Sequence, residues 1–180
     1  MKRGIIMLLS TACFCAAGVE AKEKRISERP TGEITIDGAA TDWAGALSGI
    51  KDSPVSLGIR NDDAYLYVCL SMDRPMGVMM SGMTVWFDPD GGGDRTLGVR
   101  FPLGLRNVDH PPLPEPDRNR EKMREMFVES LREMEILGPD KDDRREIRHG
   151  DLPGLEAAVN LADDVLVYEL RIPLHTDAAH

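Results

Sequence analysis

The chain has 180 residues, a formal net charge of −9 and an aromatic content of 5%. The acidic balance argues against a nucleic-acid partner, because proteins that bind phosphate backbones present clustered positive charge. The low aromatic content leaves few rings for stacking on sugars. The length is sufficient for one domain that closes its own hydrophobic core.

The N-terminus has the layout of a secretory signal peptide. Lys2 and Arg3 precede an apolar run over residues 4–17, and the small residues Val19 and Ala21 follow it. The run is shorter than the roughly 20 residues that span a bilayer. We therefore expect residues 1–21 to be a cleaved leader, and the mature chain to be periplasmic or secreted without a transmembrane segment.

The cysteines support export without a disulfide. Removal of the leader takes away Cys13 and Cys15 and leaves Cys69 as the single cysteine, so no internal disulfide is expected. Cys13 also marks an alternative, a lipoprotein, but the leucine usual three residues before a lipidated cysteine is displaced to Leu9. Cys69 lies in an apolar strand pattern and is predicted to be a small buried hydrophobe.

The first part of the predicted domain consists of short strands separated by polar turns. Residues 22–32 are charged and without periodicity, which indicates a flexible lead-in, and the domain is expected over 33–180. The segments with strand-like composition are 33–36, 55–60 and 65–71. In the third segment, apolar residues occupy both alternating positions, which predicts a central strand covered on both faces.

The middle of the chain combines a methionine-rich helix with a hairpin. Four methionines recur every three or four residues and predict a short helix over 74–82; they are Met76, Met79, Met80 and Met83. Strands are expected over 83–87 and 96–101. The glycine-rich segment 88–94 between them is predicted to be a hairpin loop.

A proline-rich and helical insert is predicted over about 102–150. Its first part, 102–116, is a loop because its prolines block regular structure. Apolar residues then recur with helical spacing over 118–137, which predicts an amphipathic helix. The dense charge of 140–148 is typical of a solvated loop.

The last predicted elements are antiparallel strands over 155–161 and 165–172, turned at 162–164. No further strand pattern follows, so either the sequence is truncated at its C-terminus or one sheet edge is open. The predicted fold class is all-β: a mostly antiparallel β-sandwich of jelly-roll or immunoglobulin-like type, with a helical insert.

Four short motifs follow one another along the chain in a characteristic order and spacing. They are Ile36-Asp37-Gly38 with Asp42-Trp43, Asn61-Asp62-Asp63 with Tyr65-Leu66-Tyr67-Val68, Trp86-Phe87-Asp88-Pro89, and Tyr168-Glu169-Leu170-Arg171-Ile172-Pro173-Leu174. In this arrangement the chain resembles the family 9 carbohydrate-binding modules and the wider DOMON-like sandwiches, which include haem-binding domains. It also resembles a group of exported bacterial proteins that share this sandwich. The resemblance implies a non-catalytic binding domain with carbohydrate as its ligand.

The resemblance does not supply a complete binding site. Family members grip sugar ends between two exposed tryptophan rings, whereas this chain has only Trp43 and Trp86. Trp43 matches a structural element of the family and is expected in the core. Trp86 faces away from its strand neighbours and could be a single stacking platform beside Tyr65 and Tyr67. The alternative is that the insert covers the Trp86 ring.

Two other ligand classes fit particular residue groups. Asp88, Asp90 and Asp94 offer hard oxygen ligands for calcium in one loop, although aspartate and glycine are also ordinary hairpin residues. The methionines over 76–83 could serve copper or haem, with a partner among the four histidines, but core packing explains their spacing. Those histidines are His110, His149, His175 and His180.

The sequence contains no motif typical of an enzyme, and no zinc, phosphate-loop or dinucleotide signature. We therefore expect no catalytic residue and no obligatory cofactor. Two alternatives to carbohydrate binding stay open: a haem or redox-carrying domain, and an envelope module that docks a protein partner through the helix at 118–137.

Overall fold

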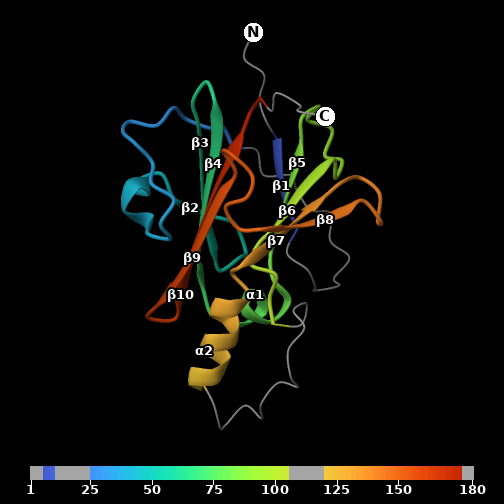
Figure 1. Cartoon of the computed structure of the whole chain (residues 1–180). Helices are drawn as coiled ribbons and strands as arrows, with labels where there is room; N and C mark the ends of the chain where they lie inside the picture. Colours follow the sequence, from blue (N-terminus) through green and yellow to red (C-terminus); the bar gives the residue numbers. More distant parts are fainter. Residues whose placement is uncertain (1–5, 11–24, 106–119, 176–180) are drawn as a thin grey trace. The chain divides into compact units, whose positions relative to one another are not determined.

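A computed structural model describes residues 6–10, 25–105 and 120–175 (Figure 1). The chain divides into two compact units, residues 1–25 with 76–148 and residues 26–75 with 149–180. Each unit contains one five-stranded sheet in which all neighbouring strands are antiparallel. The predicted all-β, mostly antiparallel fold class is confirmed.

The sheet of the second unit has β4 at its centre. Its strand order is β2 (Ser48–Gly49), β3 (Val55–Asn61), β4 (Tyr65–Asp73), β10 (Val165–Pro173) and β9 (Glu156–Ala162). The prediction of a central strand over 65–71 is confirmed. Turn chemistry joins β9 to β10, because Asp163 and Asp164 both adopt positive φ, as a tight hairpin requires.

One face of this sheet is an apolar core. Val68 lies opposite Ile59 on β3 and Leu170 on β10, and both Val68 and Leu170 are fully buried. Leu70 lies opposite Leu57 and Tyr168 in the same way. The period of two along each strand places these residues on one side.

The opposite face of the same sheet is covered by the segment that precedes it. The 3-10 helix η1 (Ala40–Trp43) buries Trp43 completely, in a cluster with Ile34, Tyr67 and Cys69. Cys69 is a free, fully buried cysteine, as the sequence predicts. Burial and the nearby Glu169 carboxylate raise the pKa of its thiol to about 12.

The sheet of the first unit has β5 next to one edge. Its strand order is β1 (Ile6–Ser10), β5 (Thr84–Asp88), β6 (Leu97–Arg100), β7 (Glu133–Leu137) and β8 (Arg144–Arg148). The helices α1 (Met76–Ser81) and α2 (Arg120–Glu129) belong to the same unit. Val85, Phe87 and Val99 are buried on one face of this sheet.

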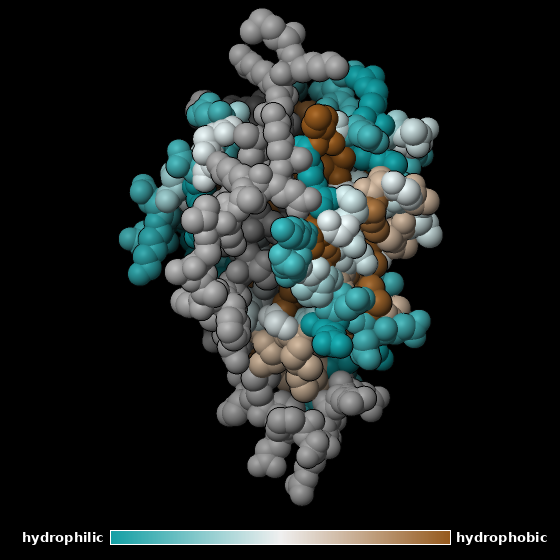
Figure 2. Space-filling model, turned by 180° about the vertical axis from the view of Figure 1, so that it is seen from behind, coloured by the Kyte–Doolittle hydropathy of each residue, from teal (hydrophilic) through white to brown (hydrophobic). Residues whose placement is uncertain are grey.

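The methionine stripe is buried only in part. Met79 and Met83 are buried, whereas Met76 is 56% exposed at the start of α1. Hydrophilic residues cover much of the described surface in Figure 2, with smaller hydrophobic areas between them. Within the described residues, no helix has the length and apolar character that crossing a membrane requires.

The predicted helix over 118–137 is wrong in its second half. α2 ends at Glu129, where Leu131 and Arg132 close a turn by donating to the carbonyls of Val128 and Glu129. β7 then begins at Glu133, and its Met134 faces Ile147 of β8 in a hairpin. The apolar residues of β7 are spaced so that they also satisfy a helical pattern, and tertiary pairing decides between the two.

Two further predicted segments differ from the structure. Residues 140–148, predicted to be a loop, contain β8, whose charged residues belong to an edge strand with Ile147 as its one buried side chain. Residues 33–36, predicted to be a strand, have no sheet partner. The Thr35 amide instead donates to the Asp42 carboxylate at 2.9 Å.

The described part of the predicted leader forms a strand. Residues 6–10 are β1, paired with β5 from Ile6 opposite Asp88 to Ser10 opposite Thr84. The other predictions for residues 1–21, including those for Cys13 and Cys15, lie outside the described residues. The proline-rich loop is described only up to residue 105.

Candidate functional site

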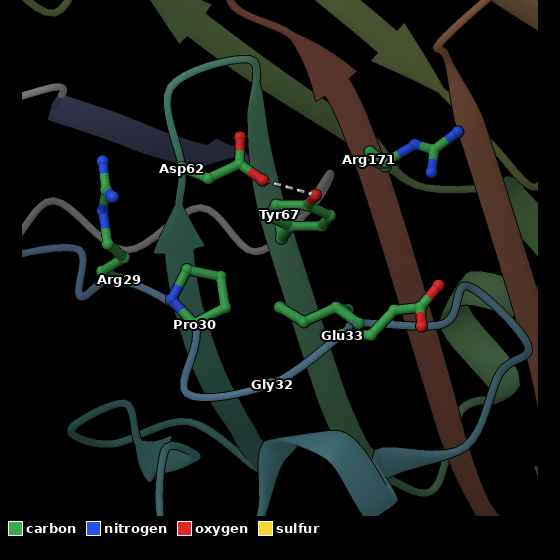
Figure 3. A pocket seen from close by; sticks show the side chains of 8 residues that line it. Arg29, Pro30, Gly32, Glu33, Asp62, Tyr67 and Arg171 are labelled. Carbon is green, nitrogen blue, oxygen red and sulfur yellow. Dashed lines mark hydrogen bonds between the residues drawn. The ribbon is translucent and has the colours of Figure 1, made fainter.

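The second unit contains an open cavity of about 390 Å³ (Figure 3). The segment 29–34 forms one wall, and the turn between β3 and β4 together with residues of β4 and β10 forms the other. The lining residues are Arg29, Pro30, Gly32, Glu33, Ile34, Asp62, Tyr67 and Arg171.

Asp62 organises the turn at the mouth of the cavity. One carboxylate oxygen, Oδ1, accepts the amides of Ala64 at 2.8 Å and Tyr65 at 2.7 Å. The other, Oδ2, accepts the Tyr67 hydroxyl at 2.9 Å, as Figure 3 shows. The polar turn that the sequence places here therefore also fixes the orientation of an aromatic ring inside the cavity.

The same contacts separate the pKa values of the two groups. Desolvation acts to raise the pKa of Asp62, but the hydrogen bonds from Ala64, Tyr65 and Tyr67 outweigh it and the net pKa is lowered. Desolvation, together with the negative Asp62 carboxylate, raises the pKa of Tyr67 to about 12. At neutral pH the pair is thus a carboxylate that accepts and a phenol that donates.

The outer wall is held in place by hydrogen bonds to β3. The Glu28 amide donates to the Ile59 carbonyl at 3.4 Å, and the Asn61 amide donates to the Glu28 carbonyl at 3.0 Å. Arg29 forms an ion pair with Asp63 in the turn between β3 and β4. The described part of the expected flexible lead-in, residues 25–32, is therefore hydrogen-bonded to the sheet.

Arg171 closes the cavity on the β10 side. Its Nη2 lies 2.5 Å from Glu156 Oε1, and its guanidinium carbon lies 4.7 Å from the centre of the Tyr65 ring. The strand register places the three side chains on the same face, since Arg171 lies opposite Tyr67 on β4 and opposite Glu156 on β9. The result is a row of aromatic, cationic and anionic side chains across three strands.

The residues that the sequence proposed as one sugar site belong to different units. Tyr67 lines the cavity, and Tyr65 lies beside it with its ring centre 6.2 Å from that of Tyr67. Trp86 belongs to the other unit and is half-buried. There the Arg95 guanidinium carbon lies 5.6 Å from the centre of the Trp86 ring, which also packs on Gly98.

The predicted calcium ligands form a hairpin loop organised by Asp88. Its carboxylate accepts the amides of Asp90 at 3.0 Å and Asp94 at 2.9 Å, and also the amide of Gly93. The bonds from Asp94 and Gly93, the strongest of these influences, lower the pKa of Asp88. In the described ranges, no three His, Cys, Asp or Glu side chains gather as a metal would require.

Gly38 and Trp43, from the first of the four motifs, have a structural role next to the cavity's sheet. Glu169 is fully buried on β10, and its carboxylate accepts the Trp43 indole N–H at 2.7 Å and the Gly38 amide at 2.7 Å. Gly38 has a φ of +80°, and a Cβ there would meet the Asn160 side chain at 2.9 Å. Glu169 thus fastens the covering segment to the strand that carries Arg171.

The structure also describes some of the residues proposed for haem binding and for protein docking. His149 Nε2 lies 2.6 Å from the Ala157 carbonyl oxygen, and His175 is exposed. His110 and His180 lie outside the described residues. The proposed docking stripe over 118–137 is divided between α2 and β7, so it does not form one helical face.

Sequence reasoning did not identify Asp62, Arg29, Pro30, Glu33 or Arg171 as site residues. Their common signal was weak, because the wall over 29–34 has no periodicity and Arg171 sits in a strand that reads as core. The alternation around Arg171 was the one usable sign, since it puts a charge on the same face as Tyr67. Comparisons with family models, curated proteins and solved structures found no match.

Proposed function

We propose that the chain is an exported, non-catalytic domain that binds a carbohydrate in the cavity lined by Asp62, Tyr67 and Arg171. The observation that carries this proposal is the combination of an aromatic ring with a carboxylate and a guanidinium around one open cavity. Sugars present hydroxyl groups that both donate and accept hydrogen bonds, together with apolar ring faces. The cavity offers a partner for each.

The fixed geometry of the lining supports recognition of a small polar ligand. Asp62 holds Tyr67, and Glu156 with Tyr65 holds Arg171, so binding orders few side chains. Pro30 adds a rigid apolar surface on the opposite wall (Figure 3). The planar Arg171 guanidinium can direct N–H donors to two neighbouring hydroxyls.

The assignment to export and to carbohydrate rests on the sequence. The basic and apolar start supports a cleaved leader over 1–21, and the ordered motifs resemble carbohydrate-binding modules. The exported protein is then periplasmic or secreted. N-terminal sequencing of the protein recovered from a bacterial periplasm tests this part alone, and an intact Met1 would contradict it.

A glycan array with two matched variants tests the binding site. Arg171→Met keeps the unbranched stem of the side chain and removes the charged guanidinium next to Tyr65. Arg95→Met makes the same change next to Trp86. We expect the wild type and Arg95→Met to bind the same glycan, and Arg171→Met to lose at least about tenfold in affinity, roughly 1.4 kcal/mol.

Loss of binding in Arg95→Met but not in Arg171→Met would move the site to Trp86, which the sequence proposed as a possible stacking platform. An array on which the wild type binds no glycan would remove the carbohydrate proposal. Circular dichroism of both variants checks that the loss of affinity does not come from unfolding.

A further inference from the structure

Without β1, β5 would become an edge of the first unit's sheet with little charge to protect it. β5 has the sequence TVWFD, in which the only charge is the terminal Asp88. β8, at the opposite edge, has the sequence RREIR, and edge strands rich in charge resist pairing with other chains. In the second unit, β2 has only two residues, and His149 contacts the Ala157 carbonyl of β9.

The backbone of β5 offers hydrogen-bonding groups on this edge. The Met83 carbonyl accepts the Phe101 amide at 3.0 Å on the β6 side. Successive residues of an antiparallel strand direct their backbone N–H and C=O groups to alternate neighbouring strands. The backbone groups of Val85 and Phe87 therefore point to β6, as those of Met83 do. Thr84 and Trp86 therefore direct their N–H and C=O groups to the other side, where β1 places Ser10 and Leu8 opposite them.

β1 is part of the segment that the proposed export would remove. Cleavage after residue 21 would leave the Thr84 and Trp86 backbone groups without β1 and would expose an apolar strand edge. Such an edge is a template for another strand. This step rests on the proposed export, because the edge stays covered in a chain that keeps residues 6–10 paired.

We propose that the edge freed by leader removal pairs with β5 of a second copy, giving an antiparallel dimer about a two-fold axis. The strand is self-complementary in this arrangement. Centred on Trp86, the pairing sets Trp86 opposite Trp86 of the second copy and Val85 opposite Phe87, with Thr84 opposite Asp88. A closed isologous contact uses the same patch on both copies.

The side chains of β5 suit this second copy. Val85 and Phe87 are buried at 0% and 6% exposure on one face, so pairing extends that apolar face across both sheets. Trp86 is half-buried on the other face, and the two indoles would form a cross-strand aromatic pair. The edge carries no charge before Asp88 that would repel its copy.

Sedimentation velocity of the full chain and of Leu8→Pro tests the proposal. Leu8→Pro removes the N–H opposite Trp86 and so frees the edge without shortening the chain. We expect the wild-type chain with its leader to be monomeric and Leu8→Pro to be dimeric. The processed protein that begins at Lys22 provides a second route to the same free edge.

A lysine at the centre of the contact supplies the matched control. Trp86→Lys in the Leu8→Pro background should restore the monomer, because two lysines would face each other. Asn160→Lys puts the same charge on the exposed β9 edge and should leave the dimer intact. Monomeric Leu8→Pro and processed chains, or a dimer that survives Trp86→Lys, would overturn the proposal.

The experiments can overturn the proposed dimer and the proposed sugar site independently of each other. Glycan binding that depends on Arg171 but occurs in monomers at every concentration would sink the dimer alone. A dimer broken by Trp86→Lys in a protein that binds no glycan would sink the carbohydrate proposal alone.

Discussion

The Trp43 indole donates a 2.7 Å hydrogen bond to the carboxylate of Glu169, although 126 residues separate them in the chain. Both residues are fully buried. Desolvation raises the pKa of Glu169, while the hydrogen bonds from Trp43, Gly38 and Asp37 act in the opposite direction. The contact joins the covering segment to the strand that presents Arg171, and it therefore supports the candidate site from behind.

Glu169→Gln is expected to destabilise the protein by about 1–3 kcal/mol, because the new amide group would face an N–H donor and leave it unsatisfied. Urea unfolding measures the change. Glu156→Gln, at a partly exposed ion pair on β9, should cost less than about 1 kcal/mol. Equal losses in the free energy of unfolding for Glu169→Gln and Glu156→Gln would show that the buried carboxylate has no special role.

Gly58→Ala is expected to destabilise the same unit by about 1–3 kcal/mol through overpacking. A Cβ at Gly58 would lie 2.7 Å from the Trp43 ring, which is held by Glu169 and cannot move freely. Gly49→Ala on β2 is the control, because no atom lies within 4 Å of its Cβ position. Thermal unfolding compares the two. A Gly58→Ala protein as stable as Gly49→Ala would contradict the tight packing.

Asp62→Asn is expected to lower the pKa of Tyr67 from its value of about 12. The asparagine oxygen can still accept the turn amides, but the negative charge beside the phenol is lost. Carbon NMR of labelled tyrosine during an alkaline titration follows this residue directly. An unchanged or higher pKa would show that the carboxylate does not control the phenol.

Asp88→Asn is expected to lower the Tm at neutral pH, because Asp88 organises the hairpin loop through backbone hydrogen bonds. Its pKa in the folded protein is below the ordinary 3.8, so the charged form stabilises the fold above that value. The Tm difference from wild type should therefore shrink as the pH falls through the lowered pKa. Thermal scans from pH 7 to pH 2 measure it, and a difference that widens at low pH would refute the assignment.

Calcium provides a separate test of the same loop. A calcium site formed by Asp88, Asp90 and Asp94 would raise the wild-type Tm on addition of calcium, and a chelator would reverse the shift. We expect no such shift, because the Asp88 oxygens already accept backbone amides. A calcium-dependent rise that Asp88→Asn abolishes would restore the metal assignment.

The strands were predictable where alternation was strong, and the errors fall where two patterns coincide. Val55–Asn61 and Val165–Pro173 alternate clearly and match their predicted segments closely. Glu133–Leu137 also fits a helical repeat, and only its pairing with β6 and β8 makes it a strand. Arg144–Arg148 has too few apolar residues for a sequence pattern to reveal it.

The candidate site was predictable only through its tyrosines and its turn. Tyr65, Tyr67 and Asp62 belong to a motif that local chemistry explains. The wall at Arg29 and Pro30 depends on contacts with β3, and Arg171 reaches the site through strand register. Such long-range pairings leave no local signal in the sequence.

Amide chemical-shift mapping with the glycan selected on the array tests the central proposal most directly. We predict that the perturbed amides cluster at 31–34, 62–67 and 171, with little change around Trp86. Perturbations confined to β5 and β6 near Trp86, with none at Tyr67 or Arg171, would contradict the proposed site.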